Sequence, residues 1–344
     1  MDSMWNNDFD RFVAHYSQRQ SPRASRCEPE VGIEYLGADM GRESGFQRVA
    51  IHHVILPPGR RTSLPHAESL EEEFVLVLDG EPDLWLNGFL YHLQVGHAVG
   101  FPAGTGVGHS FINNSGSDVQ LLVAGERTKP KNLCAFPVNP EVKHSSEIWW
   151  TDAPNHILGP HQGRPGPLKP DEVGTFPSDC VVYCPALERR SASFSYPGDT
   201  ETFGEGIRLT NILGLKALGI NFEYLAPGKR SAYPHAHTHE EEFVFVIEGT
   251  ATVWMDGFTR EIGPGDFAAF PSNTGIAHVI INDSDRDVIY LCVGETAEFP
   301  DEKLTYPLNA IRNEEGRKAG WLWEDAPTGP QGPHPGLPKT LRRK

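Results

Sequence analysis

Short apolar runs separated by glycine, proline and paired turn residues recur along the whole chain. The runs at 75–78 and 244–247 are rich in valine, leucine and isoleucine, as in short buried strands. Those at 83–86 and 252–255 lead into Asn-Gly and Asp-Gly pairs, which favour type I′ hairpins. The 35 glycines and 29 prolines fit many strands joined by many turns. The pattern predicts an all-β architecture.

Helical periodicity is confined to the N-terminus. Apolar and aromatic residues recur there at the spacing of one helix face, namely Trp5, Phe9, Phe12, Val13 and Tyr16. We therefore expect residues 1–30 to form a helix or an arm that packs on the rest of the chain.

Two strips rich in proline and glycine, at 153–170 and 326–339, follow the strand-rich regions. Such strips cannot form helices or central strands, because proline lacks the backbone N–H that both need. We expect extended arms that lie over the sheets. Their histidines, His156, His161 and His334, are expected on the surface and not as metal ligands.

The second half of the chain repeats the first. The stretch PHAESLEEEFVLVLDG at 65–80 aligns without a gap with PHAHTHEEEFVFVIEG at 234–249. The same offset of 169 residues holds from Gly59 and Gly228 to Glu126 and Glu295. An internal repeat of this length indicates two copies of one domain. We expect an N-terminal domain at 31–170 and a C-terminal domain at 171–344, each with a proline-rich tail.

Charge and composition narrow the possible partners. The formal net charge is −16, and nucleic-acid binding or attachment to an anionic membrane needs a basic surface that this chain does not offer. No apolar run approaches the ~18 residues of a membrane span, and the first residues lack a secretory pattern. We expect a cytoplasmic protein that binds a small-molecule substrate and contacts neither nucleic acid nor membrane. Its five cysteines lack the spacing of a zinc or redox motif.

Four residues of the second copy form a candidate metal site. His235 and His237 are two apart, so both rings face the same side of a strand. Glu242 begins the next apolar run, and His278 follows much later in PSNTGIAH. Three imidazoles and one carboxylate suit a divalent first-row metal. On an octahedral ion they would leave two positions for substrate, water or O₂. The neighbouring His239, Glu240 and Glu241 are alternatives for the acid or for a group that supports a ligand.

The first copy carries His66, Glu73 and His109 at equivalent positions, but Glu68 replaces the second histidine. Two histidines and two carboxylates could hold a harder ion such as Mn²⁺. Without a metal the two carboxylates would repel, and one pKa would rise. Either the site binds such an ion, or Glu68 swings out and the site is vestigial. This set is therefore a possible degenerate second site. We favour the second copy as the working one and expect one tightly bound metal per chain.

These motifs resemble those of the cupin superfamily, in particular two-domain members, or bicupins. The first cupin motif, Gly…His-x-His…Glu…Gly, is matched by Gly228, His235, His237, Glu242 and Gly249. The second, Gly…Pro…Gly…His…Asn, is matched by Gly265, Pro271, Gly275, His278 and Asn282. Both motifs contain slightly longer spacers than the family pattern. The resemblance covers nearly the whole chain, taken twice.

The resemblance implies two tandem jelly-roll-type β-barrels, each open at one end with the metal near the mouth. It also implies a metal drawn from Fe, Mn, Ni, Co and Zn, with Fe the first choice. Bicupins often associate, so we expect a homo-oligomer.

Three functions are compatible with this interpretation. We favour a non-haem Fe(II)-type dioxygenase acting on a small organic acid or carbonyl compound in an aromatic-rich C-terminal barrel. A non-redox metal enzyme is the alternative: a sugar-phosphate isomerase, lyase or decarboxylase. It is suggested by similarity to poorly characterised bicupins labelled as sugar-phosphate isomerases. Basic residues after the PG turns, among them Arg61 and Arg230, could then bind phosphate. The third possibility is a binding or storage bicupin without turnover.

Overall fold

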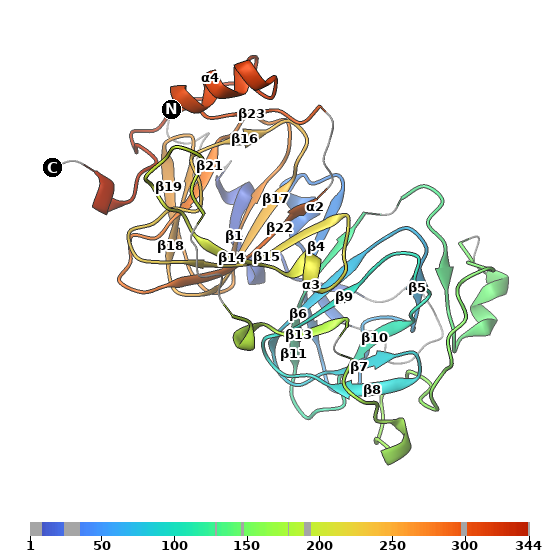
Figure 1. Ribbon diagram of the computed structural model, residues 1–344. Helices are drawn as coiled ribbons and strands as arrows, with labels where there is room; N and C mark the ends of the chain where they lie inside the picture. Colours follow the sequence, from blue (N-terminus) through green and yellow to red (C-terminus); the bar gives the residue numbers. More distant parts are fainter. Residues whose placement is uncertain are drawn as a thin grey trace.

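The computed structural model describes residues 9–23, 35–127, 129–145, 148–177, 179–188, 194–296 and 301–342. Figure 1 shows two bodies rich in β-strands, one from each half of the sequence, side by side. We call them the N-terminal barrel and the C-terminal barrel. The predicted all-β tandem cupin architecture is confirmed.

The two barrels have the same strand order. The main sheet of the N-terminal barrel has the order β13-β9-β6-β11-β4-β3-β2, and that of the C-terminal barrel has the order β1-β20-β17-β22-β15-β14. A second, three-stranded sheet closes each barrel, β10-β7-β8 in one and β19-β18-β21 in the other. A two-stranded ladder, β12-β5 or β16-β23, completes each.

The strands are short. The first half contains β2 (Ser21–Arg23), β3 (Tyr35–Asp39), β4 (Val49–Leu56), β5 (Ala67–Glu68), β6 (Glu73–Asp79), β7 (Asp83–Leu86), β8 (Phe89–His92), β9 (His97–Phe101), β10 (His109–Ile112), β11 (Val119–Glu126) and β12 (Cys134–Ala135). The second contains β14 (Glu205–Arg208), β15 (Leu218–Leu225), β16 (Ala236–His237), β17 (Glu242–Glu248), β18 (Ala251–Met255), β19 (Phe258–Ile262), β20 (Asp266–Phe270), β21 (His278–Ile281), β22 (Val288–Glu295) and β23 (Leu304–Thr305).

Helices are few. Besides the helical residues 9–12, the α-helices among the described residues are α2 (Met40–Ser44), α3 (Leu209–Ile212) and α4 (Ala310–Ala319). The 3₁₀ helices are η1 (Tyr16–Gln18), η2 (Pro140–Ser145), η3 (Pro170–Glu172), η4 (Cys184–Ala186) and η5 (Lys339–Leu341). Among the described residues, no helix combines the length and the apolar character that crossing a lipid bilayer requires.

Each barrel borrows its edge strand from the other half of the chain. β1 (Val13–His15) precedes the N-terminal barrel but pairs antiparallel with β20 of the C-terminal barrel. β13 (Val181–Tyr183) precedes the C-terminal barrel but pairs with β9 of the N-terminal barrel. The N-terminal helix that we expected is only partly present. Residues 9–12 are helical, Val13–His15 form β1, and Trp5 lies outside the described residues.

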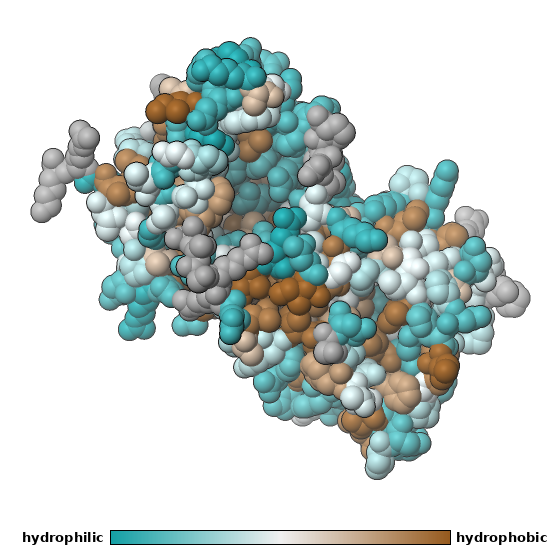
Figure 2. All heavy atoms as spheres, in the orientation of Figure 1, coloured by the Kyte–Doolittle hydropathy of each residue, from teal (hydrophilic) through white to brown (hydrophobic). Residues whose placement is uncertain are grey.

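Side-chain alternation separates two cores. In β17, Phe243 and Phe245 face the neighbouring barrel, whereas Val244 and Val246 face the interior of their own barrel. The core between the barrels contains the β-sheet residues Val49, Ile51, Phe74 and Leu76 of one half and Leu218, Ile220, Phe243 and Phe245 of the other. The two main sheets therefore pack face to face. Figure 2 shows apolar residues gathered on the visible face close to where the two bodies meet.

The proline-rich strips are extended arms that rest on the predicted hairpins. Asn87 and Asp256 have φ of 46° and 47°, as a type I′ turn requires of its first central residue. The glycine after each turn touches the arm, since a Cβ on Gly257 would come within 2.3 Å of Gly332 O. Trp254 Nε1 donates to His334 O at 2.8 Å. In the first arm His161 is only 6% exposed, so its expected surface position was wrong.

Candidate metal centre

The C-terminal barrel brings the four predicted ligands together. His237 lies on β16, Glu242 begins β17, and His278 begins β21. His235 is joined to His278 by an isolated antiparallel bridge. One ligand atom from each of the four residues lies within 4.8 Å of the other three.

Two of the histidines point Nε2 at the carboxylate. His278 Nε2 lies 3.4 Å from Glu242 Oε2, and His235 Nε2 lies 4.0 Å from the same oxygen. His235 Nδ1 is 2.7 Å from Tyr233 O, so it donates its hydrogen there and leaves Nε2 free for a metal. The ring of His278 is stacked on Phe270 at 3.7 Å between centroids. Backbone and aromatic contacts therefore fix these rings.

The third histidine provides the test of whether a metal fits. His237 Nε2 is buried and has no hydrogen-bond partner. A buried polar atom without a partner is costly, and a metal ion at the centre of the cluster would satisfy it. The donor set suits a divalent first-row metal. The residues present therefore fit the ion that the motif implies.

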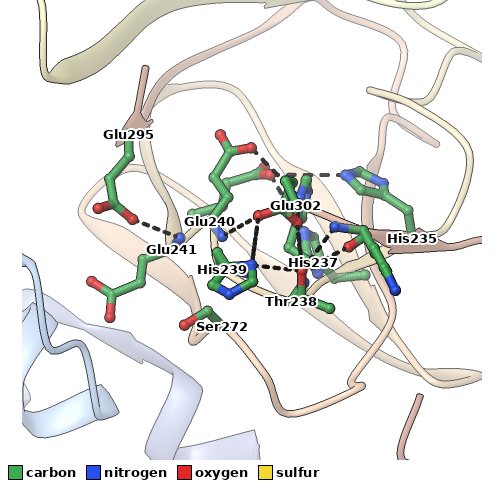
Figure 3. A network of polar contacts seen from close by, with 12 residues as sticks. His235, His237, Thr238, His239, Glu240, Glu241, Ser272, Glu295 and Glu302 are labelled. Carbon is green, nitrogen blue, oxygen red and sulfur yellow. Dashed lines mark hydrogen bonds and ion pairs between the residues drawn. The ribbon is translucent and has the colours of Figure 1, made fainter. Parts of the chain in front are cut away.

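Glu302 supports His237 from outside the cluster, as Figure 3 shows. Its Oε1 lies 3.5 Å from His237 Nδ1, at ion-pair distance. Its carboxylate also accepts hydrogen bonds from the backbone N–H groups of Thr238, His239 and Glu240 at 3.0 to 3.1 Å. Sequence reasoning missed Glu302, because it lies far from the motif in the chain and outside the repeated stretch.

His239, Glu240 and Glu241, the neighbours of the candidate ligands, lie in three different environments. Glu240 Oε2 lies 3.5 Å from His237 Nδ1, and burial raises the pKa of Glu240 to about 7. His239 faces Asp301 and Glu302. Glu241 points away from the site and into the interface between the barrels. None of the three belongs to the cluster of ligand atoms.

Charges inside the site favour ionised Glu242. Burial would raise its pKa, but hydrogen bonding to His278 and electrostatic interaction with His278, His235 and His237 lower it to about 2. Burial, together with the other two histidines, lowers the pKa of His235 to about 3. A carboxylate without its proton beside a neutral imidazole is the state that coordinates a metal.

The N-terminal barrel brings together three of its four candidates. His66, Glu73 and His109 place ligand atoms within 4.8 Å of one another. His109 Nε2 is buried without a hydrogen-bond partner and lies 3.8 Å from Glu73 Oε1. Burial first, and then the charge of Glu68, raises the pKa of Glu73 to about 8. This carboxyl therefore keeps its proton at neutral pH when no metal is bound.

Glu68 lies apart from that cluster. Its Oε1 accepts a hydrogen bond from Cys134 Sγ at 3.9 Å, and further hydrogen bonds join it to Glu71 and Asn132. Asn132 occupies the position of Glu302, because β12 and β23 are equivalent strands. The two barrels thus differ at two linked positions. His237 faces the Glu302 carboxylate in the C-terminal barrel, whereas the Glu68 carboxyl group faces the Asn132 amide in the N-terminal barrel.

The aromatic lining expected for the C-terminal barrel was largely wrong. Phe222, Tyr224, Phe243 and Phe245 lie in the core between the barrels. Instead, Glu223, Tyr290 and Cys292 share the interior face of β15 and β22 with Leu225 and Val288. Cys292 Sγ lies 3.8 Å from Glu242 Oε1. The alternation of apolar and polar residues along β15 could have revealed this interior.

The arginines proposed for phosphate binding are engaged in the fold. Arg230 Nε lies 2.7 Å from Glu201 Oε1, and its Nη1 donates to Gly336 O of the second arm at 2.7 Å. Arg61 is fully buried and donates to Gly163 O of the first arm. Both arginines bind the proline-rich arms through hydrogen bonds, which argues against a phosphosugar site at these positions.

A cupin-domain family model matches residues 52–125 and 221–294, one match in each barrel. Quercetin 2,3-dioxygenase of Bacillus subtilis is 25% identical over 233 residues, which cover 64% of this chain and 67% of that protein. Germin-like protein subfamily 2 member 1 of Arabidopsis thaliana is 31% identical over 128 residues. That match covers 33% of this chain and 56% of the germin-like protein.

Solved structures with the same fold include oxalate decarboxylases. The Lactobacillus farciminis enzyme, in a formate complex, has a TM-score of 0.51 at 16% identity and covers 86% of this chain and 88% of its own. A mutant of the Bacillus subtilis enzyme has a TM-score of 0.53 at 15% identity, with coverage of 95% and 89%. At these identities the likeness concerns the fold alone.

Proposed function

This chain belongs to the cupin superfamily as a two-domain bicupin, and we propose that it is a metal-dependent enzyme whose reaction takes place in the C-terminal barrel. One observation carries the proposal: His237 Nε2 is buried without a partner at the centre of a cluster completed by His235, Glu242 and His278. The N-terminal barrel, with Glu68 turned aside, chiefly supports the fold.

His235, His237, Glu242 and His278 would hold the ion. A bound Fe(II) or other first-row divalent ion supplies Lewis acidity and open positions for small ligands. Glu242 acts as an ionised ligand and not as a base, because three histidines stabilise its charge. Tyr233 O and Glu302 hold the outer nitrogens of His235 and His237, so that both rings present Nε2 to the same point.

The reaction we propose is the addition of O₂ to a small organic acid or carbonyl compound, as in a non-haem Fe(II)-type dioxygenase. Similarity to a quercetin 2,3-dioxygenase along two thirds of that protein supports this class. The manganese centres of the Bacillus subtilis oxalate decarboxylase, a protein of the same fold, make Mn(II) the second ion to test.

The test is oxygen consumption by the metal-loaded protein, with Fe(II) and Mn(II) compared across a panel of organic acids, flavonols and other carbonyl compounds. We expect uptake with at least one compound and none in a His278→Ala variant. Turnover of an acid without O₂ would instead select a lyase or decarboxylase. Light scattering of the same preparations tests the expected homo-oligomer.

A further inference from the structure

The interior of the C-terminal barrel contains a carboxyl group that the metal site does not use. Glu223 lies on β15, opposite Tyr290 of β22, and Val246 of β17 continues the same row. Tyr290 and Val246 belong to the interior core of this barrel, as does Leu225, two residues after Glu223. Because side chains alternate along a strand, Glu223 points into the barrel too.

The carboxyl of Glu223 has no partner among the residues that the structure describes. Among residues 9–23, 35–127, 129–145, 148–177, 179–188, 194–296 and 301–342, it makes no hydrogen bond and no ion pair. It lies over Gly206 of β14, where a Cβ would come within 2.4 Å of Oε1 and 2.6 Å of Oε2. Burial, and then the charge of Glu242, raises its pKa to about 7. Glu223 is only partly buried, and a carboxyl that points into a barrel without a protein partner is open to a ligand.

The N-terminal barrel shows that the fold does not need this group. The counterparts of Glu223, Tyr290 and Cys292 are Val54, Leu121 and Val123, and all three pack in the apolar interior of that barrel. At these three positions, polar side chains are therefore confined to the barrel that holds the complete ligand set.

Three strands of this interior carry carboxyl groups and no basic residue at their inward positions, whereas Arg208 of the neighbouring β14 shares the face of Asn221 but is exposed. The inward positions of β15, β17 and β22 are Gly219, Asn221, Glu223, Leu225, Glu242, Val244, Val246, Val288, Tyr290, Cys292 and Gly294, with no lysine or arginine among them. A divalent ion at the metal site would compensate a dianion only in part, because Glu242 already offsets one of its charges, and a dianion beside Glu223 would still be unfavourable. A hydroxyl group could donate a hydrogen bond to Glu223, whose neighbours Leu225, Val244 and Val246 are apolar.

We propose that Glu223 is a substrate-binding residue that accepts a hydrogen bond from a hydroxyl group, so that the C-terminal barrel takes uncharged, hydroxyl-bearing, partly apolar compounds in preference to small dianions. This inference rests on the proposed function and narrows its substrates from organic acids or carbonyl compounds to uncharged compounds that carry a hydroxyl group. It also accounts for the unpartnered carboxyl.

Calorimetry on the metal-loaded protein without O₂ tests the assignment, with quercetin and catechol as hydroxylated probes and oxalate as the dianion. We expect at least one hydroxylated probe to bind more tightly than oxalate. Glu223→Val should weaken its binding about tenfold, the effect of one lost hydrogen bond to a charged group. The same variant should bind oxalate more tightly, because a negative charge is gone. Gly206→Ala should weaken the hydroxylated probe too, since its methyl group displaces the carboxyl.

Controls separate binding from folding and from metal loading. Glu261→Gln removes an exposed carboxylate on β19 and should leave all three affinities unchanged. Metal content should equal that of the wild type in every variant, and the isosteric Glu223→Gln serves if the valine variant does not fold. Unchanged affinity for the hydroxylated probe in the Glu223 variants overturns the inference. So does tighter binding of oxalate than of both hydroxylated probes by the wild type. Because no turnover is needed, failure of the oxygen-uptake test alone leaves this result standing.

Discussion

Glu72 and Glu241 occupy equivalent positions in the two halves, and each buried carboxylate accepts hydrogen bonds from three consecutive backbone amides of the opposite half. Glu241 accepts from residues 47, 48 and 49 at 2.6, 3.1 and 3.0 Å. Glu72 accepts from residues 216, 217 and 218 at 2.8 to 3.1 Å. Each of these glutamates immediately precedes a ligand candidate, so strand alternation sends one side chain to the interface and the next to the metal site.

Removing one of these two carboxylates should weaken the contact between the two barrels. Glu72→Gln keeps the shape but loses the charge that strengthens the amide hydrogen bonds, and we expect a loss of about 1.5–3 kcal/mol in the free energy of unfolding. Urea denaturation measures it, with the exposed Glu261→Gln as control. Equal urea denaturation midpoints for Glu72→Gln and Glu261→Gln would contradict this stabilising role of Glu72.

One metal ion should bind tightly to each chain. His278→Ala should abolish that binding, because His278 is a ligand in the complete set, whereas His66→Ala in the other barrel should leave it intact. Metal analysis after dialysis gives the stoichiometry. Two tight equivalents, one of them lost in His66→Ala, would show that both barrels work.

Glu302 should increase metal affinity through His237. Glu302→Gln removes the carboxylate that faces His237 Nδ1, and such supporting groups are worth 10- to 100-fold in affinity. Competition with a chelator measures the change. Asn132→Asp, at the equivalent position of the other barrel, is the matched control and should not alter the tight site.

Metal binding in the N-terminal barrel should depend on pH. The pKa of Glu73 is raised to about 8, so a proton competes with the ion at pH 7 and leaves as the pH rises through 8. Glu242, with a pKa lowered to about 2, is ionised throughout. Titration of a His278→Ala variant with Mn²⁺ at pH 7 and pH 9 should show tighter binding at pH 9. Equal affinities would contradict the buried, protonated Glu73.

Glu223→Gln should stabilise the protein, and more so at high pH. The pKa of Glu223 is raised to about 7 in the folded state, above its unfolded value of 4.5. Its protonated form therefore favours folding, and stability falls as the pH rises between these values. The amide avoids that loss, and we expect a gain of about 1–3 kcal/mol at pH 8 and little at pH 4. Melting curves at both values measure it, and a gain independent of pH would argue for a different cause.

The repeat, the all-β fold and the residues that gather in the C-terminal barrel could be predicted from sequence, because a strict offset and a two-residue strand period fix them locally. The sequence offered the departure of Glu68 from the ligand cluster as one of two alternatives. It could not decide between them, since the position of Glu68 depends on Asn132 and Cys134, far along the chain. The placing of Phe243 and Phe245 could not be predicted from sequence either. Both faces of β17 are apolar, and only the packing of the second barrel shows which face is the interface.

The borrowed edge strands set the order in which this chain can fold. Val13 pairs with Ala268, so a segment that precedes the N-terminal barrel in the chain waits for a partner strand in the C-terminal barrel. Contacts this distant in sequence form late, because closing a long loop costs entropy before it yields any pairing. Until then the edge of β20 offers unpaired backbone groups to any other strand, including the same segment of a second chain. The sheet of the C-terminal barrel is therefore completed, and protected from strand exchange between molecules, only when β1 pairs with β20.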